Sequence, residues 1–378
     1  MPRITGSYVR QPGGYQAFIP NALPPSPPIR FDDELWNLLS RADRALGRLD
    51  GSIQTLPNPD MFVLMYVRKE AVLSSQIEGT QASLNDVLQV EARVMTADRP
   101  DDVGEVLNYA HALNYGLARL NELPVSLRLF REIHERLMQD VRGHHATPGD
   151  FRTSQNWIGP AGALLREATY VPPPPNELQR VLGEFETFIH HTDPLPILVK
   201  IGLAHAQFET IHPFLDGNGR MGRLLITFLL CEKEVLIKPV LYLSHYFKAH
   251  RARYYALLQN TREEGDFESW LKFFLAGVAE VSTEATDTAR KIVDLREAHR
   301  SLIVEKFGRI AGNGIAVLER LFLGPFVTVP TVASTLGITF QSANSLMGKL
   351  EVEGIVAEQT GQRRNRVFAY RPYIDLFR

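Results

Sequence analysis

Cysteine is nearly absent from this chain, since Cys231 is the only one in 378 residues. A single cysteine excludes an internal disulfide, and the apolar neighbours Leu229, Leu230 and Val235 favour a small core residue over a nucleophile. No uninterrupted stretch reaches the roughly 18 apolar residues of a membrane-spanning helix. Residues 1–6 also lack the apolar run of a signal peptide. We therefore expect a cytoplasmic protein with no membrane partner.

The chain also lacks an excess of charge of either sign. Its net charge is -2, with 22% charged and 44% hydrophobic residues, so the whole molecule does not resemble a nucleic-acid binder and any basic surface is local. No G-x-x-x-x-G-K-[ST] segment occurs, which leaves a Walker-type phosphate loop without support. The length favours two or three domains.

Apolar residues recur at helical spacing along most of the chain and predict a mainly α fold. In the N-terminal part of the chain, the predicted helices cover 32–49, 61–78, 101–120 and 127–141. The composition divides the chain into an irregular Pro-rich arm, an N-terminal helical region, a helical core and a smaller C-terminal domain; the ranges are 1–30, 31–120, 121–290 and 305–378. Within the core, glycines and four consecutive prolines surround 163–171, which we predict to form a short hairpin; an ordinary surface loop is the alternative.

The segment from His212 to Arg223 reads HPFLDGNGRMGR and lies between two helical patterns. Gly217 and Gly219 allow successive backbone N–H groups to turn toward one point, at the positive end of the next helix, so the junction suits an anion. Asn218 lies between these two glycines. Phe214 is expected to point inward and anchor the loop.

Four side chains of this segment have the chemistry of a nucleotide site. Arg220 and Arg223 are three residues apart on the first helical turn, and their guanidinium groups suit polyphosphate oxygens. Asp216 is a hard oxygen ligand that can hold Mg²⁺. His212 can remove a proton from a nucleophile near neutral pH.

Two other readings of these residues have weaker support. His205, Glu209 and His212 share one helical face at the spacing of a metal site, but His205 also lies in an apolar stripe, which favours a hydrogen-bonded core histidine. Gly217, Gly219 and Gly222 spell G-x-G-x-x-G. The dinucleotide fingerprint requires a preceding strand, whereas this pattern is helical.

The twelve residues resemble the signature of the Fic family, His-x-Phe-x-Asp/Glu-Gly-Asn-Gly-Arg-x-x-Arg, at every defined position. The resemblance implies an enzyme that transfers AMP from ATP to a Ser, Thr or Tyr hydroxyl of a protein. It implies His212 as the base and Asp216 as the ligand of Mg²⁺. It also implies ATP-phosphate contacts by residues of the turn and the following helix, namely Gly217, Asn218, Gly219, Arg220 and Arg223.

Ser74 to Gly79 closes a predicted helix and resembles the inhibitory motif Ser/Thr-x-x-x-Glu-Gly/Asn of Fic proteins. A carboxylate at a helix C-terminus is unfavourable unless a cation is near, so Glu78 should have a partner; a solvated glutamate is the alternative. The resemblance implies that Glu78 pairs with Arg223 at the γ-phosphate position and that Ser74 fixes the helix. The same glutamate can orient a water for removal of AMP.

The resemblance extends to two further places. It makes 163–171 the flap that docks the target protein by strand addition. It also makes Tyr254 and Tyr255 neighbours of the nucleotide base, although both can equally be core residues of an amphipathic helix. Self-modification and a homodimer are further expectations from similar proteins.

The C-terminal domain has helix-turn-helix spacing, with helices over 330–336 and 339–353 and a turn at Gly337. Basic residues follow in strand-like segments, which predicts a winged helix; they are Arg363, Arg364 and Arg366. From residue 305 onward nine Lys and Arg face six Asp and Glu, a small excess. DNA binding and protein contact both remain open. The rival functions are transfer of another nucleotide or of phosphate, and a transcription regulator that senses nucleotide.

Overall fold

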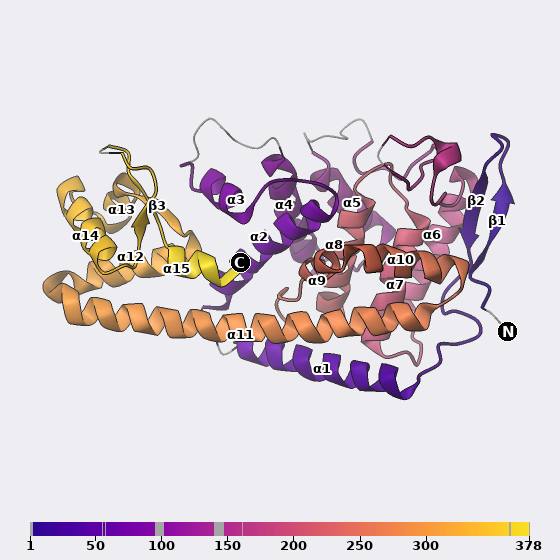
Figure 1. Cartoon of the computed structure of the whole chain (residues 1–378), viewed down its shortest axis with the longest axis horizontal. Helices are drawn as coiled ribbons and strands as arrows, with labels where there is room; N and C mark the ends of the chain where they lie inside the picture. The colour runs from indigo at the N-terminus through magenta and orange to yellow at the C-terminus, as the bar shows by residue number, and fades with distance from the viewer. Residues whose placement is uncertain are drawn as a thin grey trace.

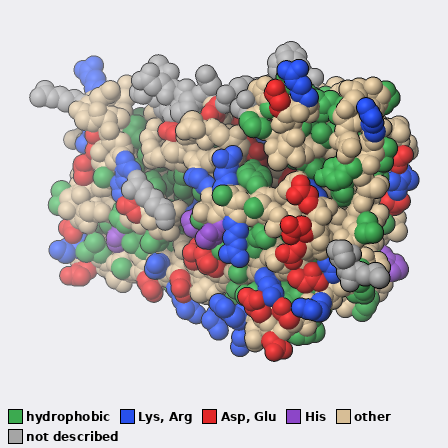
Figure 2. All heavy atoms as spheres, turned by 45° about the vertical axis from the view of Figure 1, so that its right-hand side comes forward, with side chains coloured by type: hydrophobic (Ala, Val, Ile, Leu, Met, Phe, Trp, Pro, Cys, Tyr) green, Lys and Arg blue, Asp and Glu red, His purple; other side chains and the backbone are tan. Residues whose placement is uncertain are grey.

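The computed structural model describes residues 3–54, 56, 58–94, 102–139, 147–160, 162–362 and 364–377. It is mainly helical, as the periodicity predicted, with short strands at its two ends. Figure 2 shows basic and acidic side chains interspersed over one face, in keeping with the small net charge.

Two helices at the centre carry the motif. α7 (Ile197–Ile211) and α8 (Asn218–Glu232) pack against each other and are buried along almost their whole lengths. Their neighbours are mostly amphipathic helices that turn apolar stripes inward. These are α4 (Val103–Arg119), α5 (Leu127–Leu137), α6 (Pro175–His190), α9 (Ser244–Ala249) and α10 (Arg251–Glu263). The loop between α7 and α8 is thus fixed on several sides by packed helices.

α11 (Phe267–Phe307) is a single helix of 41 residues that runs along the molecule (Figure 1). α1 (Asp33–Gln54) packs along it and contributes a stripe of buried leucines. α11 also contacts α7 and α10 near one end and α12 at the other. It therefore joins the helical core to the C-terminal unit without a break.

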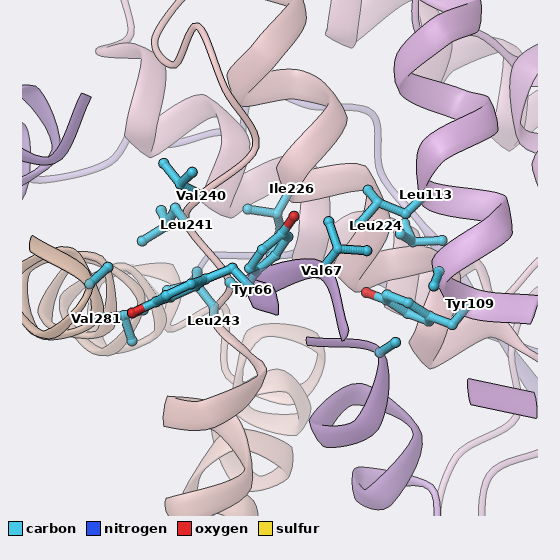
Figure 3. Packing of buried hydrophobic residues seen from close by; sticks show 14 of the residues in the cluster. Tyr66, Val67, Tyr109, Leu113, Leu224, Ile226, Val240, Leu241, Leu243 and Val281 are labelled. Atoms are coloured by element: carbon cyan, nitrogen blue, oxygen red, sulfur yellow. The ribbon is translucent and has the colours of Figure 1, made fainter. Parts of the chain in front are cut away.

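α2 (Pro59–Ile77) passes through the middle of the molecule and is followed by α3 (Leu84–Glu91). Figure 3 shows Tyr66 and Val67 of α2 among side chains of α4, α8 and α11, including Tyr109, Leu224 and Val281. The ring of Tyr66 also meets Phe377 edge-on at a centroid distance of 5.5 Å. α2 is held by apolar contacts on more than one face, so its C-terminal residues have a defined position.

The expectation of an irregular arm over residues 1–30 is wrong for its first part. β1 (Gly6–Arg10) and β2 (Gln16–Pro20) form an antiparallel hairpin with Gly6 opposite Pro20 and Arg10 opposite Gln16. Apolar side chains of β2 such as Phe18 are buried. The proline cluster that suggested irregular structure begins at Pro24, after the last pairing residue Pro20, and therefore follows the hairpin rather than prevents it.

The C-terminal unit combines helices with a small sheet. Its helices are α12 (Ala311–Leu323), α13 (Val329–Leu336), α14 (Phe340–Val352) and α15 (Arg371–Ile374), with short 3₁₀ turns at Gly308–Ile310 and Asp375–Phe377. Its strands β3 (Phe326–Thr328), β4 (Ala357–Glu358) and β5 (Val367–Ala369) pair antiparallel in the order β3-β5-β4. The predicted helices, and the turn at Gly337 with φ of 63°, are confirmed.

Candidate active site

The backbone between α7 and α8 has two left-handed residues, of which the sequence predicted only Gly217; Gly219, the other predicted glycine, lies inside α8 and has no positive φ. His212 ends α7 with φ of 50°, and Gly217 precedes α8 with φ of 75°. Asn218 closes the turn, because its side chain accepts a hydrogen bond from Phe214 N and donates one to Phe214 O, both at 2.8 Å. Phe214 is fully buried, as predicted, and stacks on His134 at a centroid distance of 3.8 Å. The first turn of α8 is thereby aimed into a cavity.

The cavity beside this turn has a volume of about 550 Å³. Every site residue predicted from the motif lines it, and so do Glu78, Tyr254 and Tyr255. Residues from the loop before α6 complete its wall, among them Trp157 and Tyr170. Ser74 lies behind the wall, where it holds Arg223. The structure thus gathers side chains that are more than 140 positions apart in the sequence.

His212 presents a neutral imidazole to this cavity. Its side chain is 18% exposed, and its backbone carbonyl accepts hydrogen bonds from Arg152 Nε and Asn156 Nδ2 at 3.0 and 3.2 Å. Burial, together with the guanidinium groups of Arg262 and Arg152, lowers the pKa of His212 to about 3. A neutral imidazole has a free lone pair and can accept a proton.

Arg223 is held by the end of α2. Its Nε donates to Ser74 Oγ at 2.8 Å, and its Nη2 donates to Ser74 O at 3.0 Å and to Glu78 Oε1 at 2.7 Å. Arg223 is thus the cationic partner that we expected for Glu78 at the helix C-terminus. The carboxylate raises the pKa of Arg223 further above its usual range, despite burial. Arg223 therefore cannot turn toward another anion without losing contacts to α2.

Arg220 is buried but poorly paired. Its side chain is 5% exposed, Nη1 lies 3.6 Å from Glu105, and Nη2 donates to Met138 Sδ at 3.4 Å. Nε and Nη1 have no hydrogen-bond partner within the part of the chain that the structure describes. A buried guanidinium with free N–H groups at a cavity wall is suited to bind phosphate oxygens.

Asp216 is exposed at the cavity, and its Oδ1 accepts a hydrogen bond from Gly217 N at 2.6 Å. No group of three His, Cys, Asp or Glu side chains in the described ranges can hold a metal ion. One carboxylate suits Mg²⁺, which usually takes one or two protein carboxylates and completes its shell with phosphates and water. The donor set at Asp216 therefore fits magnesium brought in with a nucleotide.

Two protein-family models match the chain, the Fic/DOC family N-terminal model over residues 36–118 and the Fic/DOC family model over residues 124–230. Together they match half of the chain. This chain belongs to the Fic/DOC family. Its motif and its α2 segment lie inside the two matched ranges.

The Fic chain is similar to curated proteins named Protein adenylyltransferase Fic. The protein of Drosophila virilis is 31% identical over 202 residues, and that of Aedes aegypti is 31% identical over 205 residues. Each match covers 52% of this chain, but only 38% and 37% of the respective relative. The Fic chain thus spans less than two fifths of the length of these relatives.

Solved structures share the fold. A Fic family protein from Desulfovibrio desulfuricans superimposes with a TM-score of 0.60 at 19% identity, covering 91% of this chain and 97% of that chain. A Fic-domain signaling protein from Bacteroides thetaiotaomicron has a TM-score of 0.51 at 18% identity, with 68% and 97% covered. The first of these likenesses extends over almost the whole Fic chain.

The segment predicted as a hairpin in this Fic chain has a different structure. Residues 163–171 contain a 3₁₀ turn at Leu165–Glu167, and the only strand-like pairing in the described part of the loop is a bridge between Ile158 and Tyr170. The hairpin prediction is therefore wrong in its boundaries. Residues 165–167 form the 3₁₀ turn in place of a strand, and Glu167 caps that turn by accepting a hydrogen bond from Leu164 N at 3.0 Å.

The two tyrosines of the Fic site differ from each other. Tyr254 is fully buried, stacks on Phe247 and hydrogen bonds to His205 Nε2 at 2.8 Å. Tyr255 is 38% exposed at the cavity edge. His205 is itself buried and bonded through Nδ1 to Gly222 O at 2.8 Å, so the reading as a hydrogen-bonded core histidine is confirmed.

Sequence reasoning missed the residues that brace the Fic motif from outside. Gly149 N donates to His134 Nδ1 at 3.0 Å, which leaves Nε2–H of His134 to donate to Asp216 O at 3.0 Å. Burial lowers the pKa of His134 to about 4, so the ring is neutral. Arg152 and Asn156 hold the His212 carbonyl. No spacing rule links these positions to the motif, because they come from separate elements.

Proposed function

We propose that this Fic protein transfers AMP from ATP to a Ser, Thr or Tyr hydroxyl of a protein. One observation supports this most strongly. His212, Asp216, the first turn of α8 and Arg223 line a single cavity of about 550 Å³, a size within the usual range for small-molecule sites. The names of the curated relatives agree with this chemistry.

In the proposed reaction the target hydroxyl attacks the α-phosphorus of ATP. A bond forms between the hydroxyl oxygen and the α-phosphorus, the bond to the bridging oxygen breaks, and pyrophosphate leaves with the electron pair. His212 accepts the hydroxyl proton. The backbone of Gly217, Asn218 and Gly219, with Arg220, holds the phosphates by charge and by the helix terminus. Magnesium at Asp216 would neutralise phosphate charge.

We further propose that Glu78 inhibits this reaction. Its ion pair with Arg223 is the supporting contact, since the same guanidinium is the proposed γ-phosphate ligand. With Ser74 also bonded to Arg223, ATP would meet an occupied position and bind in an unproductive pose. Glu78 is also 39% exposed and can orient a water, so removal of AMP by the same site belongs to the proposal.

The target protein is proposed to dock at segment 163–171. Trp157 and Leu164 are 40% and 51% exposed on this loop, which gives an apolar platform beside the cavity. Tyr255 is proposed to border the nucleotide base. Self-modification, a homodimer and a cytoplasmic location complete the proposal. No helix in the described part of the chain is long and apolar enough to span a membrane.

Two labelled forms of ATP test the reaction class. The Glu78→Gly protein is incubated with cell lysate, magnesium and ATP labelled at the α- or the γ-phosphate. Protein label from the α position alone supports AMP transfer, label from γ alone shows phosphorylation instead, and absence of both contradicts the proposal. Mass spectrometry of labelled bands then identifies the target residue.

A nucleotide-sensing DNA-binding regulator is the second candidate, and the C-terminal unit supports it. α14 exposes Gln341, Ser345 and Lys349, and Arg366 Nη2 donates to Asn344 at 2.6 Å beside that helix. We propose that this unit is a winged helix with α14 as its recognition helix. Arg363 lies outside the described residues. Filter binding to DNA over a salt series tests it, because phosphate contacts weaken steeply with salt. Binding that does not change with salt would contradict it.

A further inference from the structure

Glu209 is a buried carboxyl group in the active-site cavity that belongs to no motif. It occupies the last turn of α7, three residues before His212, is 6% exposed and lines the same cavity. Its Oε1 atom has no hydrogen-bond partner among the residues that the structure describes. A carboxyl oxygen that is buried without a hydrogen-bond partner costs free energy, so its position needs an explanation.

Gly222 makes room for this carboxyl group. A β-carbon at position 222 would lie 2.4 Å from Glu209 Oε1, well inside contact distance. The backbone of Gly222 has an ordinary helical conformation, and its carbonyl accepts from His205. The absence of a side chain at 222 therefore serves the position of Glu209 rather than the conformation of α8.

The carboxyl group faces the ring nitrogen of His212 that points away from the cavity. Nδ1 of His212 is buried and makes no well-formed hydrogen bond within the described ranges. Glu209 Oε2 lies 3.9 Å from Nδ1, and the Glu209 backbone carbonyl lies on the same side of the ring. Because His212 is partly exposed while Nδ1 is buried, the exposed edge of the ring carries Nε2.

Proton transfer to His212 requires a particular tautomer. The lone pair that takes the hydroxyl proton must be on Nε2, so the ring proton must be on Nδ1 before the reaction. After transfer, the imidazolium carries a positive charge in a pocket that already contains Arg262 and Arg152. Those cations disfavour the imidazolium, and a carboxylate at Nδ1 would offset them.

We propose that Glu209 is a positioning residue for His212, whose carboxylate accepts the Nδ1–H bond and so fixes the tautomer with the Nε2 lone pair in the cavity. This bond requires the carboxyl group to move from 3.9 Å to a hydrogen-bond distance of about 2.8 Å from Nδ1. The role in catalysis rests on the proposed AMP transfer, but the tautomer does not.

Neighbouring charges agree with this role. Burial raises the pKa of Glu209 to about 7, Arg223 and Arg262 oppose that rise, and Glu78 adds to it. Departure of Glu78 from Arg223 would remove a negative charge near Glu209 and leave it more readily ionised. The carboxylate, which is the form that the bond to Nδ1–H requires, is therefore favoured further in the uninhibited enzyme.

Two variants test the charge and the position of the Glu209 carboxyl group separately. Glu209→Gln removes the charge and keeps the volume, whereas Gly222→Ala keeps the carboxyl group and displaces it. Gly202→Ala is the matched control. Gly202 also lies on α7, but a β-carbon there would be 2.9 Å from Leu271 of α11 and would not meet Glu209. All three are made in wild type and in the Glu78→Gly background.

Spectra of ¹⁵N-labelled imidazole give the tautomer of His212 directly, with His212→Ala to assign the signal. We expect the Nδ1–H form in wild type and in Gly202→Ala, and a loss of that form in Glu209→Gln and Gly222→Ala. In the Glu78→Gly background both should lower kcat by about tenfold or more, but by no more than the roughly 10²–10⁴ that a general base supplies, with KM for ATP unchanged.

An unchanged tautomer in both variants would overturn the proposal. It would show that Nδ1–H of His212 donates to the backbone carbonyl of Glu209 instead. A rise in KM for ATP with kcat unchanged would also overturn it. If the tautomer changes as expected while no variant transfers AMP, the positioning role stands and the proposed reaction fails.

Discussion

The Glu78 carboxylate occupies the space beside Gly219 in which any other residue would carry a β-carbon. A β-carbon on Gly219 would lie 2.3 Å from Glu78 Oε1 and 3.1 Å from Arg223 Nη1. The ion pair and the phosphate-facing turn of α8 therefore share one small volume. An anion that approaches this turn closely has to displace the Glu78 side chain.

Glu78→Gly is expected to raise AMP transfer about five- to tenfold or more. The ion pair it removes is partly exposed, so its loss corresponds to about 1 kcal/mol or somewhat more, and each 1.4 kcal/mol is a factor of ten. Initial rates with α-labelled ATP measure the change. Ser74→Ala should give a smaller rise, since it leaves the carboxylate on Arg223. Equal rates in wild type and Glu78→Gly would reject inhibition by Glu78.

His212→Ala in the Glu78→Gly background should reduce transfer by about 10²–10⁴, the usual contribution of a general base. ATP affinity, measured by calorimetry, should change little, because the imidazole is proposed to act on the target hydroxyl and not on the phosphates. Transfer at more than a tenth of the parent rate would show that another group takes the proton.

Arg220 and Arg223 should respond differently to replacement by methionine. Arg220→Met should weaken ATP binding about tenfold while changing the free energy of unfolding by roughly 1 kcal/mol or less, because two of its nitrogen atoms, Nε and Nη1, have no hydrogen-bond partner among the described residues. Arg223→Met loses three hydrogen bonds and should cost about 3 kcal/mol or more. Chemical denaturation measures the free energy of unfolding of both variants. Similar decreases in the two variants would contradict the different roles assigned to Arg220 and Arg223.

His205 should make stability depend on pH. Burial lowers its pKa to about 3, so the folded state stays neutral while the unfolded state binds a proton below pH 6.5 or so. Stability from this residue is therefore present above about pH 6.5 and lost as the pH falls toward 3.

Comparison with His205→Gln isolates this effect from the other buried histidines. The difference in unfolding free energy between wild type and variant should shrink by about 2 kcal/mol from pH 7 to pH 5. Denaturant titrations at the two pH values measure it. A difference that stays constant would show that His205 is not held neutral.

Much of the helical architecture could be predicted from the sequence, because long amphipathic helices leave a clear periodicity. The predicted helix at 61–78 corresponds to α2, and the one at 101–120 to α4. The hairpin of β1 and β2 was missed because five-residue strands give a weak pattern and neighbouring prolines obscured it. Short elements are defined by their partners more than by their own residues.

The candidate site divides in the same way. The residues from His212 to Arg223 are contiguous, so one segment reveals them together. Glu78 was found through the resemblance of its segment to the inhibitory motif, and a carboxylate at a helix end also needs a cation. His134 lacked such a signal, and Glu209 stood out only by its spacing with His205 and His212, which indicated a metal site rather than a positioning residue. The contact of His134 with Asp216 exists only in three dimensions.

α11 has a mechanical consequence. Its 41 residues extend for roughly 60 Å at the usual helical rise, and they join the C-terminal unit to the core through a continuous helix in place of a flexible linker. Rotation of the C-terminal unit against the core would require bending this rod or breaking its contacts with α1. A force on the C-terminal unit is thus transmitted to the helical core through α11, because the connecting helix is continuous.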